Sequence, residues 1–194
     1  MNVIQYRRIA ATLLGIWLGA GVFADIAVTR NFTTVDRFLT APGSTAAASE
    51  IQKIGAERLR PILRRNAGEE NNGLFADWET AELAIGAAML GLLFAGGKPA
   101  APLAAMVGFM LAIVAAQRFY LSPLVTDLGR QIADLPPSDP LNARFWMFHG
   151  IYSGVELAKL LAGFIAAIYM CIRKKQETEQ AIVKETPLVA RLNG

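Results

Sequence analysis

Histidine and cysteine are nearly absent from this 194-residue chain, which contains one of each, His149 and Cys171. A single cysteine excludes an intrachain disulfide and any metal site built from several cysteines. Charged residues are also scarce, at 18%, and the net charge of +3 is too small to indicate a nucleic-acid surface. We therefore expect no metal, no other cofactor and no nucleic-acid partner.

Apolar sequence is what the chain has in excess. Hydrophobic residues make up 54% of it, more than in an average soluble domain, and they are gathered into long runs. A helix needs about 20 mostly apolar residues to cross the hydrocarbon core of a bilayer. Four segments reach this length, and we predict spanning helices over residues 9–29, 78–97, 101–120 and 145–172. The lipid bilayer is thus the first expected partner.

The segments outside the spans are polar, and two of them have helical patterns. Within residues 31–77, Ser49 is suited to cap an amphipathic helix, and Pro61 is expected to kink or divide it. This helix either lies on the membrane surface or packs on the loops of the bundle. A short helix is predicted over 124–135, and the tail 176–194 has little periodicity and is predicted to be mobile.

These segments together predict an all-α, polytopic membrane protein. Residues 1–175 form one membrane domain, an antiparallel bundle of four transmembrane helices with the amphipathic helix in its first loop. Basic residues flank the outer spans at Arg7-Arg8 and at 173–175, and the positive-inside rule then places both termini in the cytoplasm. We expect the plasma membrane, which in a bacterium is the inner membrane. A secretory signal is the alternative for the first span, since Val22-Phe23-Ala24 resembles a cleavage site.

Polar side chains inside the predicted spans are the candidate functional residues. A charge within a membrane helix costs several kcal/mol unless it is paired or hydrated. On the last span, four polar residues fall within an arc of about 80° around the helix axis. The predicted topology brings polar residues of the other spans to about the same depth. We predict one intramembrane polar cluster of His149, Tyr152, Glu156, Lys159, Arg118, Glu82, Glu79 and Asp25.

Simpler interpretations of some of these residues remain open. Asp25 and Arg118 lie near the ends of predicted spans, where they would reach water or lipid headgroups. Glu79 and Glu82 lie in the first turns of a predicted helix, where negative charge is favoured by the helix dipole.

Small residues recur at every fourth position along the spans, a pattern typical of close helix packing in membranes. The glycines predicted to serve helix packing are Gly15, Gly19, Gly91, Gly108, Gly150 and Gly154. Four helices cannot use all of these faces internally, so we expect partner membrane proteins or further copies of the chain.

Four stretches resemble a known group of membrane proteins: WLGAGVFADIAV, FADWETAELAIG, QRFYLSPLV and FWMFHGIYSGVELAKLLAG. The chain is similar in them to the domain-of-unknown-function family related to transmembrane protein 205. These are small four-helix proteins with a long amphipathic first loop. The resemblance implies a four-helix membrane bundle, and it implies no catalytic residue and no cofactor.

Three classes of function are compatible with these patterns. We favour a structural or accessory membrane protein, such as a small subunit of a larger complex, in which the polar cluster is an internal clasp. The alternative is a small transporter or ion-coupled channel that uses the same polar face, although no broken helix or inverted repeat supports it. An enzyme with His149 as acid or base lacks an evident nucleophile beyond Ser153 or Tyr152, so we predict no enzymatic activity.

Overall fold

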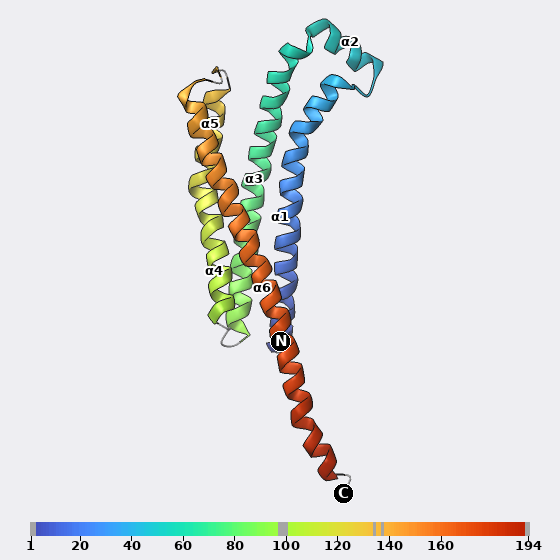
Figure 1. Ribbon diagram of the computed structural model, residues 1–194, viewed down its shortest axis with the longest axis vertical. Helices are drawn as coiled ribbons and strands as arrows, with labels where there is room; N and C mark the ends of the chain where they lie inside the picture. The colour runs from blue at the N-terminus through green and yellow to red at the C-terminus, as the bar shows by residue number, and fades with distance from the viewer. Residues whose placement is uncertain (1–2, 97–100, 134, 137, 193–194) are drawn as a thin grey trace.

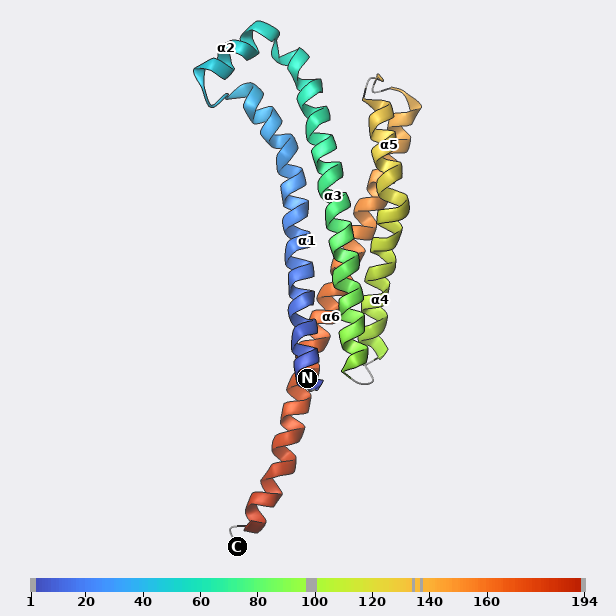
Figure 2. The same cartoon turned by 180° about the vertical axis from the view of Figure 1, so that it is seen from behind.

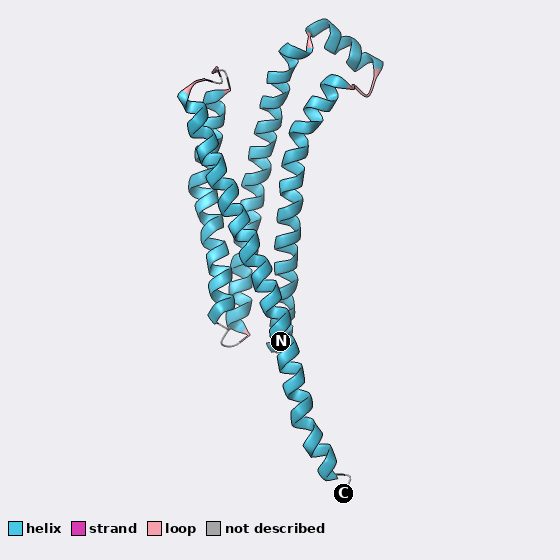
Figure 3. Ribbon diagram, viewed as in Figure 1, coloured by secondary structure: helices cyan, strands magenta, loops and turns pink. Residues whose placement is uncertain are grey.

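The computed structural model describes residues 3–96, 101–133, 135–136 and 138–192, with side chains described over 5–172 outside those gaps. Helices make up its elements (Figures 1 and 3). They are α1 (Val3–Thr40), α2 (Thr45–Ile54), α3 (Ala56–Ala95), α4 (Ala101–Ala116), the π-helical η1 (Gln117–Leu121), α5 (Ser122–Ile132) and α6 (Pro140–Leu192). The prediction of an all-α protein is confirmed.

Four helical segments of the described chain are long and apolar enough to cross a membrane. They are Gln5–Thr40, Ala56–Ala95, Ala101–Ile132 and Pro140–Ile172. Each overlaps one predicted span, because a run of about 20 apolar residues forms a helix of bilayer length. The protein is therefore an integral membrane protein. The end of the second predicted span, residue 97, and the side chains of the predicted tail lie outside what the structure describes.

Three helices extend well beyond their predicted spans: α6, which continues through the predicted tail to Leu192, and α1 and α3. Helix α1 has 38 residues and α3 has 40, which corresponds to about 57 Å and about 60 Å of helix. Both are roughly twice as long as the hydrocarbon core is thick. They lie side by side, and α2 joins them at the end away from the N-terminus (Figures 1 and 2). Residues 31–77, which we predicted as a loop with one helix, are thus mostly helical, and we call them the arm.

Polar contacts between α1 and α3 explain why the arm is helical. Asp36 of α1 accepts from Arg60 Nη1 at 2.5 Å and from Arg64 Nη2 at 3.0 Å, both on α3. Buried Asn71 of α3 donates its Nδ2 to the backbone oxygen of Val28 at 3.1 Å. These contacts join residues far apart in the sequence, so the pattern of 31–77 alone does not reveal them.

The chain turns at the tip of the arm, on both sides of α2. Ser44 caps this helix, since its Oγ accepts from the backbone N–H of Ala47 at 3.2 Å, so the cap lies earlier than the predicted Ser49. Gly55 separates α2 from α3 with φ of +92°, a conformation that side-chain-bearing residues rarely adopt. Helix α3 runs through Pro61, so the division lies at the glycine and not at the proline.

An apolar core fills the space between the helices at the N-terminal end of the bundle. It includes Trp17 of α1, Met89 of α3, Met110 of α4 and Ala166 of α6, each at most 1% exposed. Helix α6 crosses α1 near the N-terminus and lies beside α5 at its other end (Figures 1 and 2). Polar side chains occupy the interior directly beyond this core, toward α5.

Candidate functional site

The interior polar site includes the single π-helical turn between α4 and α5. A π turn inserts one residue into a helix and is frequent at functional sites. Within it, Gln117 is fully buried and its Nε2 donates to Glu156 Oε2 at 2.9 Å. The next residue, Arg118, donates its Nε to Thr80 Oγ1 of α3 at 3.3 Å. The turn thus directs adjacent polar residues to two different helices.

Lys159 of α6 lies at the centre of the site and is 1% exposed. Its Nζ is 2.6 Å from Oε1 of Glu82 on α3 and 2.7 Å from Oε2 of Glu156 on its own helix. Trp17 of α1 donates its Nε1 to the same oxygen of Glu82 at 2.8 Å. One buried ammonium is therefore shared by two carboxylates. We call Trp17, Glu82, Gln117, Glu156 and Lys159 the Lys159 network.

A second carboxylate group lies beside this network. Glu79 of α3 is 1% exposed, and its Oε1 accepts from the hydroxyl of Tyr152 on α6 at 2.9 Å. The hydroxyl of Ser122, the first residue of α5, donates to the same oxygen. Arg118 interacts with Glu79 electrostatically. The hydrogen-bond partners of Glu79 are thus two hydroxyl groups, whereas those of Glu82 include the ammonium of Lys159.

The buried charges do not balance. Glu79, Glu82 and Glu156 lie in the interior with Lys159 as the cation that bonds two of them. Three buried oxygens have no hydrogen-bond partner among the described residues: Glu79 Oε2, Glu82 Oε2 and Gln117 Oε1. The amide oxygen of Gln117 is always an acceptor, and the two carboxylate oxygens are acceptors when their groups are ionised. The interior therefore has spare capacity to hold a proton.

The structure brings most of the predicted polar cluster together. Five of the eight predicted residues bond in the two groups: Glu79, Glu82, Tyr152, Glu156 and Lys159. Asp25 and Arg118 lie at the edge. Asp25 interacts electrostatically with Glu156 and Lys159, and Arg118 does so with Glu79. His149 does not join the cluster.

His149 lies on the exposed surface of α6, among aromatic side chains. Its ring stacks on Phe145, with centroids 5.7 Å apart, and meets Trp146 edge-on at 5.6 Å. It points in nearly the same direction around the axis as Glu156. However, it lies two turns nearer to α5, where α1 and α3 separate from α6 (Figures 1 and 2). Helical spacing predicts the direction in which a side chain points from its helix. It does not predict which other helix lies beside that side chain at a given depth.

Three members of the site were not predicted: Trp17, Gln117 and Ser122. None is charged, so a search for charges within apolar runs passes over them. The sequence nevertheless contains a feature from which two of them could have been predicted. Buried carboxylates need hydrogen-bond donors, and Trp17 and Gln117 are N–H donors within predicted spans.

The six predicted packing glycines do not lie at close helix contacts in the described chain. A Cβ added at any of them meets no described heavy atom within 4 Å: Gly15, Gly19, Gly91, Gly108, Gly150 and Gly154. Close contacts occur instead at Gly86 and Gly163. A Cβ on Gly163 would lie 2.5 Å from Leu18 Cδ2, so α6 needs glycine there to approach α1. These six glycines thus lie on faces of the helices that no other described helix closely covers.

No protein-family model, no functionally characterised protein and no solved structure matches the chain. We therefore infer the function from the buried groups themselves.

Substituting Trp17 by phenylalanine tests the bond to Glu82. The ring remains in the core while the N–H donor is lost, so the free energy of unfolding is expected to fall by about 1.5–3 kcal/mol. Trp78→Phe is the matched control, because the buried Nε1 of Trp78 has no partner among the described residues. Its removal should cost nothing or stabilise. Chemical unfolding in detergent micelles measures both, and equal losses would contradict this assignment.

Proposed function

We propose that this protein is a structural or accessory protein of the membrane, whose four spans form an antiparallel bundle closed by an internal polar clasp. The observation that carries the proposal is the burial of Lys159 between the carboxylates of Glu82 and Glu156. Lys159 lies midway along α6 between the exposed Trp146 and Ile172, about 20 Å from each. That position is near the centre of the span.

Every bond of the Lys159 network but one joins two different elements. Trp17 links α1 to α3, Lys159 links α3 to α6, and Gln117 links η1 to α6. The exception is the pair of Lys159 and Glu156 within α6. In lipid, helices gain little from burying apolar surface against one another, so polar contacts and close packing hold a bundle together. A network with a member on every span is suited to fix their arrangement.

The amphipathic helix of the first loop corresponds in this proposal to α2, which lies at the tip of the arm (Figure 1). The arm places it beyond the length of α1 that a bilayer covers. This position disfavours the alternative in which the helix lies on the lipid surface, and α2 itself has no buried residue.

An accessory role needs a surface for a partner, and small-residue faces support one. Gly15 and Gly19 on α1, and Gly150 and Gly154 on α6, are exposed, with open space where a Cβ would be. Such faces allow the backbone of another helix to approach closely. The partner is another membrane protein or a second copy of this chain.

Measuring particle mass in a mild detergent tests the accessory role. We expect assemblies larger than one chain. Filling the α6 face with Gly150→Leu and Gly154→Leu together should return the protein to single chains, with little change in its unfolding midpoint. Phe109→Trp enlarges an already exposed side chain on α4, away from the α6 face, and serves as the control. Single chains for the unsubstituted protein at all concentrations, with no second protein co-purifying in the mild detergent, would contradict the proposal.

Proton-coupled transport is the second candidate, favoured by the surplus of buried carboxyl groups. Glu79 has hydroxyl partners and an unpartnered Oε2, so it is the group best placed to take up and release a proton. Purified protein in liposomes should show no proton flux if the clasp is structural. A flux that Glu79→Gln abolishes, at unchanged stability, would favour transport and overturn the accessory role.

A further inference from the structure

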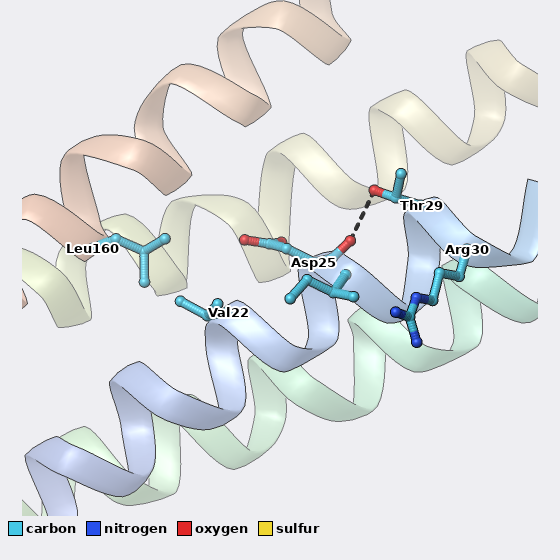
Figure 4. Close-up of a pocket in the computed structure, with 6 residues that line it drawn as sticks. Val22, Asp25, Thr29, Arg30 and Leu160 are labelled. Atoms are coloured by element: carbon cyan, nitrogen blue, oxygen red, sulfur yellow. Dashed lines mark hydrogen bonds between the residues drawn. The ribbon is translucent and has the colours of Figure 1, made fainter. Parts of the chain in front are cut away.

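A groove of about 510 Å³ lies on the surface where α1 faces α6, and this volume is typical of sites that bind small organic molecules. The side chain of Asp25 extends from α1 toward Leu160 of α6 (Figure 4). The groove thus has an apolar wall with a carboxyl group in it. Its lining residues are Val22, Asp25, Ile26, Thr29, Arg30 and Leu160 (Figure 4).

Asp25 lies inside the hydrocarbon layer, between the middle of the span and its edge. A Cβ on Gly21 would lie 3.6 Å from Leu160 Cδ2, so these two residues are level with each other. Leu160 follows Lys159, which is near the centre of the span. Asp25 is about 6 Å beyond Gly21 toward the arm, and Arg30 is about 13.5 Å beyond it. Half of the hydrocarbon core is about 15 Å thick, so Arg30 lies near its edge and Asp25 well within it.

The carboxyl group of Asp25 has no bonded partner in the described chain. The side chain is half-buried, and its interactions with Glu156 and Lys159 are electrostatic, without a hydrogen bond. Thr29 donates its hydroxyl to the backbone oxygen of Asp25 and not to the carboxyl group. An ionised carboxylate within the hydrocarbon costs several kcal/mol unless it is paired or hydrated. A cation in the groove would supply the missing partner.

The charges behind the groove also favour a cation beside Asp25. Glu156 and Lys159 of the Lys159 network act on Asp25 from the interior. Together with Glu82, these groups amount to three carboxyl groups and one ammonium. A positively charged group next to Asp25 reduces this excess, whereas an anion there increases it.

The two ends of the groove differ, and the difference selects the form of the ligand. Arg30 occupies the end nearest the membrane edge, so a second positive charge is disfavoured there. The opposite end is apolar, and its Val22 is 39% exposed, so a ligand can enter from the lipid. A suitable ligand therefore has one positive charge and an apolar body that extends from Asp25 toward the middle of the bilayer.

We propose that this groove binds a hydrophobic organic monocation that reaches it from within the bilayer. The charged centre of the ligand lies against the carboxylate of Asp25, and its apolar body lies along Val22, Ile26 and Leu160. Such a ligand would occupy the groove whether the Lys159 network acts as a clasp or in transport, because it forms none of the bonds of that network.

Equilibrium dialysis of the full chain in nanodiscs of zwitterionic lipid tests the proposal, with protein-free nanodiscs as the blank. The probes are tetraphenylphosphonium and tetraphenylborate, measured separately, which have nearly the same size and opposite charge. We expect saturable binding of the phosphonium ion and none of the borate ion. Asp25→Asn should weaken phosphonium binding about tenfold or more, because it removes the opposite charge. Asp127→Asn, at an exposed carboxylate on α5, should leave the binding unchanged.

Two further variants keep the test decisive if Asp25→Asn does not fold. Val22→Trp fills the groove and should weaken phosphonium binding, whereas Phe23→Trp enlarges an exposed neighbour that does not line the groove and should not. Arg30→Gln removes the positive charge at the outer end and should strengthen phosphonium binding. The proposal is overturned by a lack of saturable phosphonium binding, by equal or stronger saturable binding of the borate ion, or by phosphonium binding that neither Asp25→Asn nor Val22→Trp weakens.

Discussion

Lys159→Met is expected to lower the free energy of unfolding by about 3–5 kcal/mol, the cost of breaking a buried ion pair by removing one partner. Methionine fills a similar volume, so the loss comes from charge and not from a cavity. Glu82 and Glu156 would each lose the cation that lies within 2.7 Å in the intact protein. Unfolding in detergent micelles or bicelles, followed by circular dichroism, measures the change.

Lys53→Met is the matched control for this substitution. Lys53 pairs with Glu50 at 2.7 Å, a distance like those of Lys159, but both side chains are more than 60% exposed. Exposed pairs contribute about 0–1 kcal/mol because water screens and solvates the charges. A loss at Lys159 no larger than that at Lys53 would mean that the buried lysine does not hold the bundle together.

Gly86→Ala is expected to destabilise the protein by about 1–3 kcal/mol, the usual cost of overpacking a filled core. The added Cβ would lie 2.6 Å from Leu111 Cδ2 and 2.8 Å from Cη2 of Trp17. The Trp17 ring is also fixed by its bond to Glu82, so it has little freedom to move aside. The same substitution thus disturbs both the core and the Lys159 network.

Gly91→Ala, on the same helix, is the control for this prediction. A Cβ there meets no described heavy atom within 4 Å, and alanine favours a helix over glycine by about 1 kcal/mol. We expect this variant to be unchanged or slightly more stable. Thermal unfolding of both variants in the same detergent measures the difference. A Gly91→Ala variant less stable than Gly86→Ala would show that α3 packs through its other face.

The spans were predictable from the sequence because they depend on local composition. A run of about 20 mostly apolar residues is long enough to cross the hydrocarbon core of a bilayer as a helix. The arm was not predictable, because its helices continue through polar sequence. They are stabilised by contacts such as Asp36 with Arg60, which join residues from separate parts of the chain. The residue pattern of a single segment cannot predict contacts with a distant segment.

The candidate site was predictable only in part. The cost of a charge in lipid singled out Glu82, Glu156 and Lys159, and the structure places these three in contact. The same logic included His149, although the crossing of α6 leaves it exposed. Uncharged Gln117 was missed, since its role depends on a π-helical turn that no sequence pattern indicated.

The clasp and the transport candidate differ in what the surplus carboxyl groups do. In a clasp, Glu79 is held by two hydroxyl groups as a fixed link between α3, α5 and α6. In a transporter, the same group would bind and release a proton in each cycle. Stability and proton flux in Glu79→Gln separate the two, because only a clasp is expected to lose stability without any change in flux.

A double-mutant cycle between Lys159 and Glu82 tests the central claim most directly. The free energy of unfolding is measured for the intact protein, Glu82→Gln, Lys159→Met and the combined variant, all in the same lipid bicelles. A structural clasp predicts that the combined variant is more stable than the sum of the single losses implies, with a coupling energy of about 2 kcal/mol or more. Single losses that add without coupling would show that this buried pair does not join α3 to α6, and would contradict the account.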